Sequence, residues 1–316
     1  MIISASRRTD IPAFYAEWFM NRIRAGYVLT RNPFNAKQVR RVSLAPEDVD
    51  AIVFWTRNPR QLLPHLQELD ALGYRYYFQF TITGYPRILE SSVPRPQNAV
   101  ELFSQLSDLI GPDRVVWRYD PILLSSLVNL SEHKRLFAKI AGLLQGKSRT
   151  VVVSFADIYD KVKRNLASVP DLSHEDVVQQ PDAVAELSSF MAHVAAEHGM
   201  AIQSCAEEID LSTLGIPHGK CIDDDLIRRA LGVDVSRRKD KGQREACGCV
   251  ESIDIGQYNS CLHGCSYCYA TSNTRLARTN FDKHHPDSPF LIGLPDPVPS
   301  HVSSTDDENS PQGGLF

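Results

Sequence analysis

Short apolar runs rich in β-branched and aromatic residues alternate with longer amphipathic stretches over the first two thirds of the chain. Such runs are typical of buried β-strands, and the stretches between them have the periodicity of helices. The expected strands are Ile2–Ser6, Ala51–Thr56, Arg75–Thr83, Arg114–Asp120, Thr150–Ala156 and Ala201–Cys205. The expected helices are Ala13–Ala25, Arg60–Leu72, Ala99–Ile110, Glu132–Leu144 and Ala183–His198.

This alternation predicts an α/β protein, because continuous apolar strands joined by helices form a parallel sheet that is covered on its faces. Six strand–helix units favour a partial or permuted (β/α)6-type, TIM-like barrel over a doubly wound sheet. The glycine-rich phosphate fingerprint of dinucleotide-binding domains is missing from the sequence, which weakens the doubly wound alternative.

Polar side chains recur where the expected strands end, which is the edge at which parallel barrels carry their chemistry. Any one of them alone is more often a surface or buried structural group, so their recurrence is the stronger signal. The candidate catalytic residues are Arg7, Arg8, Asp10, Arg57, Arg118, Asp120 and Cys205. The candidate cofactor contacts on the expected strands are Gln79, Thr81 and Ser154.

The composition changes after the sixth strand, and this change predicts the domain organisation. Residues 1–204 form the expected barrel core, and 205–249 form a cysteine-containing insertion with the basic stretch Arg237–Lys241. Residues 250–294 provide a last strand, Val250–Tyr258, a cysteine loop and a helix from Asn273 to Arg278. The tail, 295–316, is rich in Pro, Ser, Asp and Gly and is expected to be disordered.

Composition limits the classes of function. A net charge of −4 gives no general attraction to nucleic acid or to anionic membranes. The N-terminal residues lack the apolar core of a signal peptide, and no apolar run is long enough to span a membrane. The sequence therefore predicts a cytoplasmic protein.

The seven cysteines all follow residue 200, which favours ligation over scattered structural thiols. Cys261, Cys265 and Cys268 have the spacing C-x3-C-x2-C, so their sulfurs can point at one centre. Soft sulfur ligands select iron–sulfur clusters, zinc or Cu(I). Zinc sites usually repeat a C-x2-C pair, and no matched pair follows here. Three ligands on a four-iron cluster leave one iron open for a cofactor.

The form C-x3-C-x-Tyr-Cys-Tyr resembles the cluster loop of radical S-adenosylmethionine (radical SAM) enzymes of the spore photoproduct lyase-like branch. The whole chain also resembles the DUF1848 family of uncharacterised bacterial proteins, which carries this loop at its C-terminus. Segments such as Trp117-Arg118-Tyr119-Asp120-Pro121 look like strand ends of those enzymes, although less specifically. Radical SAM enzymes usually carry the loop early, so the resemblance implies a circularly permuted barrel whose last strand lies beside the first.

The resemblance implies a [4Fe–4S] cluster on Cys261, Cys265 and Cys268, with S-adenosylmethionine on the fourth iron and Tyr267 against the adenine. It implies formation of a 5′-deoxyadenosyl radical that abstracts hydrogen from an unknown, possibly anionic substrate, such as a small molecule or a nucleotide. It also implies an electron donor such as a flavodoxin or ferredoxin. His263, between the ligands, is not assigned as a ligand.

Four cysteines remain, which is the full complement for a second, closed cluster. Their spacing matches no strong zinc pattern, so a second [4Fe–4S] cluster, a zinc site and free thiols stay open. An alternative function is a zinc- or cluster-stabilised nucleic-acid-binding protein without radical chemistry, and a third is a non-radical barrel enzyme with structural cysteines. The four remaining residues are Cys205, Cys221, Cys247 and Cys249.

Overall fold

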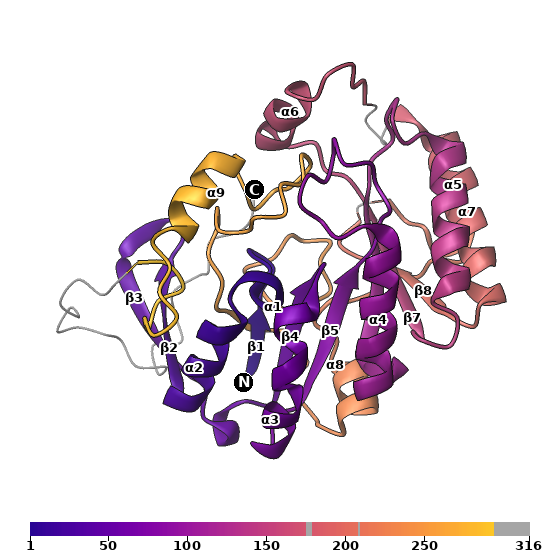
Figure 1. Cartoon of the computed structure of the whole chain (residues 1–316). Coiled ribbons are helices and arrows are strands. Elements are labelled where there is room, and N and C mark those ends of the chain that lie inside the picture. The colour runs from indigo at the N-terminus through magenta and orange to yellow at the C-terminus, as the bar shows by residue number, and fades with distance from the viewer. Residues whose placement is uncertain (175–178, 208, 294–316) are drawn as a thin grey trace.

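The computed structural model describes residues 1–174, 179–207 and 209–293, and the expected disordered tail lies outside them. Its centre is a seven-stranded sheet of parallel strands in the order β8-β7-β6-β5-β4-β1-β9 (Figure 1). The strands are β1 (Ile2–Ala5), β4 (Ala51–Thr56), β5 (Tyr76–Thr81), β6 (Val115–Ile122), β7 (Thr150–Phe155), β8 (Ala201–Ser204) and β9 (Ile253–Asp254). The α/β class with a parallel sheet is therefore as predicted.

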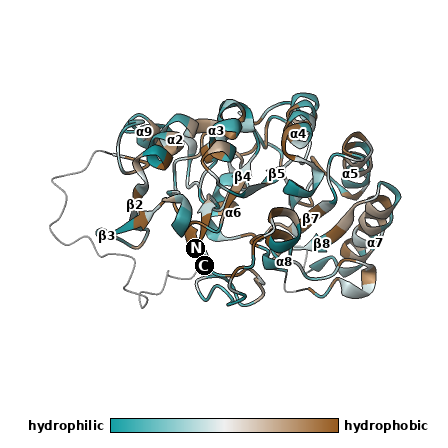
Figure 2. Cartoon of the chain, turned by 90° about the horizontal axis from the view of Figure 1, so that it is seen from below, coloured by the Kyte–Doolittle hydropathy of each residue, from teal (hydrophilic) through white to brown (hydrophobic). Residues whose placement is uncertain are grey.

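From β1 to β8 the strands are added in chain order toward one edge. Right-handed crossovers that all step in the same direction place their helices on the same face of a sheet. Figure 2 shows α2, α3, α4, α5 and α7 in an arc outside the strands, with α8 on the other side. The helices are α1 (Ile11–Phe14), α2 (Ala16–Ala25), α3 (Leu66–Ala71), α4 (Pro96–Ile110), α5 (Leu130–Leu143), α6 (Asp160–Ala167), α7 (Pro181–Glu197), α8 (Asp224–Leu226) and α9 (Thr274–Phe281).

The two faces of the sheet pack against different partners, since successive side chains of a strand point to opposite faces. On the helix-covered face, Phe54, Phe78 and Trp117 belong to the main core. On the opposite face, Val53 and Tyr77 pack against residues of the segment 205–250, including Leu226 of α8. This segment has little regular structure, and it is attached both by these side chains and by backbone hydrogen bonds such as that from the Cys205 amide to the Val153 carbonyl.

The last strand lies beside the first, as expected from the cysteine loop. Ile3 and Ser4 of β1 pair in parallel with Ile253 and Asp254 of β9. The strand is two residues long, which corrects the expected span Val250–Tyr258. Strands β8 and β9 are the two edges of the sheet and do not pair with each other in the described residues, so the sheet is open.

Several predicted elements differ in extent. The expected helix Ala13–Ala25 is divided into α1 and α2, because Tyr15 between them leaves the helical conformation. The expected helix Arg60–Leu72 is reduced to α3, preceded by two short 3₁₀ turns, the second with Pro64 near its start. The sequence analysis missed α6 and an antiparallel hairpin formed by β2 (Tyr27–Asn32) and β3 (Asn35–Ser43).

The described helices include none with the length and apolar character needed to cross a membrane. The predicted domain boundaries at residues 204, 249 and 294 stay a prediction.

Candidate functional site: two groups of thiols at one end of the sheet

The residues Cys261, Cys265 and Cys268, called here the C-terminal trio, lie in the loop between β9 and α9. The loop closes at its base, where the Asn259 amide donates to the Ala270 carbonyl at 2.9 Å. It also pairs with the loop after β5, since Cys265 forms an antiparallel bridge with Glu90. The trio therefore lies at the carboxyl edge of the sheet, among the loops that follow the first strands.

A buried pair fixes the middle of the trio's loop to the end of β1. His263 lies between the first two cysteines, and its Nε2 is 2.7 Å from Oδ2 of Asp10. The same oxygen accepts a hydrogen bond from the Arg57 amide, and Oδ1 accepts from the Ala13 amide as the cap of α1. All of these contacts occupy the Asp10 carboxylate, so the geometry gives this catalytic candidate a positioning role.

A second buried network lies beneath the loop. Arg57 donates from Nη1 to Glu90 at 2.8 Å and from Nη2 to the Tyr267 hydroxyl at 2.7 Å. Glu90 also accepts hydrogen bonds from the hydroxyls of Tyr267 and Thr83. Burial lowers the pKa of Arg57, but Glu90 together with Tyr267, Cys265 and Asp120 outweighs this effect, and the pKa is raised well above its usual value. Arg57 and Tyr267 thus support the loop through contacts within the protein.

The trio has the donor chemistry of a metal site. Burial raises the pKa of Cys261 well above its usual value, and the nearby Cys268, Asp10 and Cys265 raise it further. Burial likewise raises the pKa of Cys265 to about 12, although Arg57 opposes the change. The protein alone does not hold Cys261 and Cys265 as thiolates, so a bound cation would have to supply the positive charge. These thiols fit a cluster that is itself cationic.

The other four cysteines, Cys205, Cys221, Cys247 and Cys249, also converge in space, and we call them the second thiol set. Cys205 follows β8, and its amide donates to the Val153 carbonyl at 3.0 Å. Cys221, Cys247 and Cys249 are buried, and Cys205 packs against the same cluster. The spacing of these four cysteines along the chain did not require them to converge.

Arg118 and Gln79, which the sequence suggested as catalytic and cofactor-binding candidates, contact Cys221 of the second thiol set and not the trio. Arg118 donates from Nη1 to Sγ of Cys221 at 2.8 Å and forms an ion pair with Asp120 through Nε and Nη2. Gln79 donates to the Cys221 carbonyl at 2.8 Å and accepts a hydrogen bond from Arg118 at 3.2 Å. Tyr77, which the sequence analysis missed, donates to the same carbonyl at 2.6 Å. Polar side chains of β5 and β6 therefore hold Cys221 in place.

The remaining candidates lie between the two groups. The Arg7 amide donates to Asp254 at 2.8 Å, and its guanidinium donates to Ser252 at 3.1 Å and lies over Trp55. Arg8 stacks over Tyr258 at 5.3 Å. Ser154 is 3.5 Å from Asp120, and Thr81 is half-buried on the same face. The buried Asp254, missed from sequence, accepts from Ser4, Ser6 and Gly256 and so orders the end of β1.

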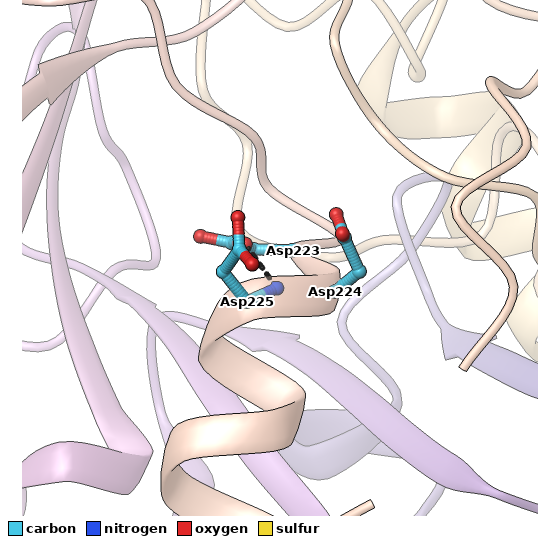
Figure 3. A group of neighbouring side chains, drawn as sticks. All are labelled: Asp223, Asp224 and Asp225. Atoms are coloured by element: carbon cyan, nitrogen blue, oxygen red, sulfur yellow. Dashed lines mark hydrogen bonds between the residues drawn. The ribbon is translucent and has the colours of Figure 1, made fainter. Parts of the chain in front are cut away.

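An acidic group and two cavities lie apart from the thiols. Figure 3 shows Asp223, Asp224 and Asp225 at the start of α8. Asp223 caps this helix, and Asp224 is paired with Lys220 at 2.6 Å, so the group has a structural explanation. A cavity of about 250 Å³ is lined by Arg8, Tyr258 and residues of β2, and one of about 220 Å³ is lined by residues such as Arg60 and Gln105. Neither cavity is lined by a cysteine.

The model of the DUF1848 family, described as a domain of unknown function, matches residues 2–270 of this chain. The chain belongs to the DUF1848 family. No curated protein matches it. A crystal structure described as that of an alpha-L-fucosidase from Bacteroides thetaiotaomicron VPI-5482 is similar over 76% of this chain and 86% of that chain, with 12% identity. Its TM-score of 0.26 is too low to carry an argument about fold or activity.

Proposed function

We propose that this DUF1848 protein is an iron–sulfur enzyme of the radical SAM type. The observation that supports the proposal most strongly is the pairing of β9 with β1, which brings the trio to the edge where strand-end residues converge. Without that pairing, a loop at the end of the chain has no reason to meet Asp10 and Arg57. The three half-buried thiols then provide one ligand each for three irons of a [4Fe–4S] cluster.

The fold proposal follows from the same pairing. Parallel strands added in chain order, with their helices on one face, have the arrangement of a (β/α) barrel wall. We take the sheet as an incomplete, permuted barrel in which β9 occupies the place before β1. The carboxyl edge would then be the mouth, where the trio lies, and the second thiol set packs on the face of the sheet opposite the helices.

The residues of the chain perform three tasks in this proposal. Cys261, Cys265 and Cys268 hold the cluster, and Asp10 with His263 orients their loop. A bound cluster of this kind supplies the electron that cleaves S-adenosylmethionine to methionine and a 5′-deoxyadenosyl radical. Buried side chains beneath the loop, including Tyr267 at 6% exposure, keep water from that side of the site. Contact of Tyr267 with the adenine stays a prediction.

The charge at the strand ends bears on the substrate. Arg57 and Arg118 are each paired with a carboxylate, so they are already engaged. Arg8 also lies 4.0 Å from a carboxylate, that of Asp254, but of these three arginines it is the one that lines the 250 Å³ cavity, and we assign it to an anionic substrate. The electron donor, a flavodoxin or ferredoxin, remains part of the same proposal.

The test is anaerobic reconstitution with iron and sulfide, followed by dithionite and S-adenosylmethionine. The wild type is expected to form 5′-deoxyadenosine, and Cys261→Ala, Cys265→Ala and Cys268→Ala are each expected to form none. Ser266→Ala serves as the matched control, because Ser266 lies in the same loop and carries no thiol. A wild-type protein that carries the cluster on the trio and never cleaves the cofactor would refute the enzyme assignment.

The alternative, a nucleic-acid-binding protein, gains no support from the basic stretch Arg237–Lys241. Arg237 lies 3.4 Å from Asp224, and Arg238 lies 3.1 Å from Glu251. Lys239 donates to the Glu245 carbonyl at 2.5 Å. These contacts place acidic and polar groups against the basic side chains, and the net charge of −4 adds no attraction to phosphates.

A further inference from the structure

Four thiols that are widely separated in sequence meet on the face of the sheet opposite the helices. Cys205 directly follows β8, Cys221 lies shortly before α8, and Cys247 and Cys249 lie shortly before β9. Cys221, Cys247 and Cys249 are buried in one cluster on that face, and Cys205 packs against it. No disulfide joins these four thiols.

The surroundings of these thiols are built for a charged occupant. Arg118, which is 6% exposed, places its guanidinium 2.8 Å from Sγ of Cys221. The Ile222 amide donates to Sγ of Cys249 at 3.4 Å. Buried apolar thiols need no such donors, whereas thiolate ligands do.

The segment that carries these cysteines has little regular structure of its own. In the part of it that the structure describes, it forms short helical turns, including α8 and a π-helical turn over Ile227–Leu231. It is attached through apolar residues such as Ile222, through the Cys205 amide, which donates to the Val153 carbonyl, and through the Cys221 carbonyl, which accepts from Tyr77 and Gln79. A metal bound by four cysteines would fasten this segment to the sheet in the way that structural metal sites stabilise small irregular domains.

The spacing of the cysteines along the chain bears on the kind of metal group. Cys247 and Cys249 are separated by one residue and the other two cysteines stand alone, whereas structural zinc sites usually repeat cysteine pairs separated by two to four residues. Four cysteines supply one ligand to each iron of a [4Fe–4S] cluster.

We propose that Cys205, Cys221, Cys247 and Cys249 bind a second [4Fe–4S] cluster that is separate from the one on the trio. Each iron has a protein ligand, so this cluster is closed and leaves no position for S-adenosylmethionine or substrate. It fastens the segment 205–250 to the inner face of the sheet. Arg118 donates a hydrogen bond to one ligand sulfur, which is a contact that sets the reduction potential of such clusters.

The test uses the full chain with Cys261→Ala, Cys265→Ala and Cys268→Ala combined, so that the trio carries no cluster. After anaerobic reconstitution this variant is expected to retain about four irons and four sulfides, whereas the wild type holds about eight of each. A variant without iron would overturn the proposal. One equivalent of zinc, held at this set without sulfide, would overturn it as well.

A matched variant assigns the ligands. Adding Cys221→Ala and Cys249→Ala to the trio variant is expected to remove the remaining iron, and full retention of iron would contradict the assignment. If that protein does not fold, Arg118→Lys in the trio variant gives a second readout. Loss of the planar donor is expected to shift the reduction potential while iron content stays the same, and an unchanged potential would count against the site.

This experiment separates the second cluster from the proposed enzyme function. The second cluster can be present in the trio variant even if the wild type never cleaves S-adenosylmethionine, in which case only the enzyme proposal fails. Conversely, a wild type that forms 5′-deoxyadenosine with about four irons in total supports the enzyme and contradicts the second cluster.

Discussion

The trio and the second thiol set show two ways in which a chain brings sulfurs together. The trio occupies eight consecutive positions of one loop, and its three thiols are half-buried. The second set comes from three segments, and three of its four members are buried. The trio's arginine, Arg57, contacts Glu90 and Tyr267, whereas Arg118 of the second set donates directly to a sulfur. The first arrangement suits an accessible reactive centre, and the second suits a closed one.

Metal removal is expected to affect the two regions very unequally. In metal-free protein, amides of the segment 205–250 should exchange hydrogen about 1,000-fold faster, because the closed site holds the segment on the sheet. Suitable probes are the Val250 amide, bonded to the Ile222 carbonyl at 3.2 Å, and the Asp240 amide, bonded to the Cys249 carbonyl at 2.9 Å. Amides of β4 and β5 provide the internal control. Equal protection of the segment with and without metal would contradict its attachment by a cluster.

Beneath the trio, the Arg57–Glu90 pair is expected to matter for stability without any metal. Arg57→Met leaves the buried Glu90 carboxylate unpaired, and such a change destabilises proteins by about 3–5 kcal/mol. Denaturant unfolding of the metal-free protein measures this effect. The exposed pair Arg24–Glu68 gives the matched control, since Arg24→Met should change stability by only about 0–1 kcal/mol. Equal effects of the two substitutions would show that the network beneath the loop is not a support.

These two regions also show what the sequence can and cannot reveal. The trio was identifiable because all its ligands lie within one loop, and the bounds of β4 were predicted as they are observed. The contacts of Cys221 with Gln79 and Arg118 could not be predicted, because these residues are separated from it by more than one hundred positions. Sequence periodicity describes one element at a time and carries no information on such distant pairs.

The missed elements have a similar explanation. In the β2–β3 hairpin, β3 is rich in Lys, Arg and Gln and largely exposed, so it lacks the apolar alternation by which strands are identified. Strand β9 is short because Asp254 bonds with Ser4, Ser6 and the Arg7 amide, and side chains replace a longer ladder there. The local pattern of apolar and polar residues thus predicted most strands of the sheet. It failed where polar side chains stabilise the structure.

The helix-covered face provides a third region, whose pH dependence is independent of the thiols. Burial lowers the pKa of His133 from 6.5 to about 4. Between these values the unfolded chain binds more protons, so metal-free protein should lose up to about 3 kcal/mol of stability as the pH falls from 6.5 to 4. His133→Gln should remove this part of the pH dependence. The exposed His193→Gln is the control, and an unchanged slope in His133→Gln would contradict the account.

The smallest expected effect concerns the pair that orients the trio's loop. His263→Leu removes the contact with Asp10, and loss of such supporting contacts typically weakens metal binding by about 10–100-fold. Chelator competition should show faster iron loss from the trio and unchanged loss from the second set. Phe14→Leu is the control, because Phe14 packs on His263 with ring centroids 4.7 Å apart but does not bind Asp10. Equal iron loss from both sites in His263→Leu would contradict the distinction.

The central claim is that the cluster on the trio has an open iron. The most direct measurement is the electron paramagnetic resonance spectrum of the dithionite-reduced wild type before and after addition of S-adenosylmethionine, with the trio variant as reference. The account predicts that the signal missing from the trio variant changes when the cofactor is added, while the signal common to both proteins does not. A reduced cluster on the trio whose spectrum is indifferent to S-adenosylmethionine would contradict it.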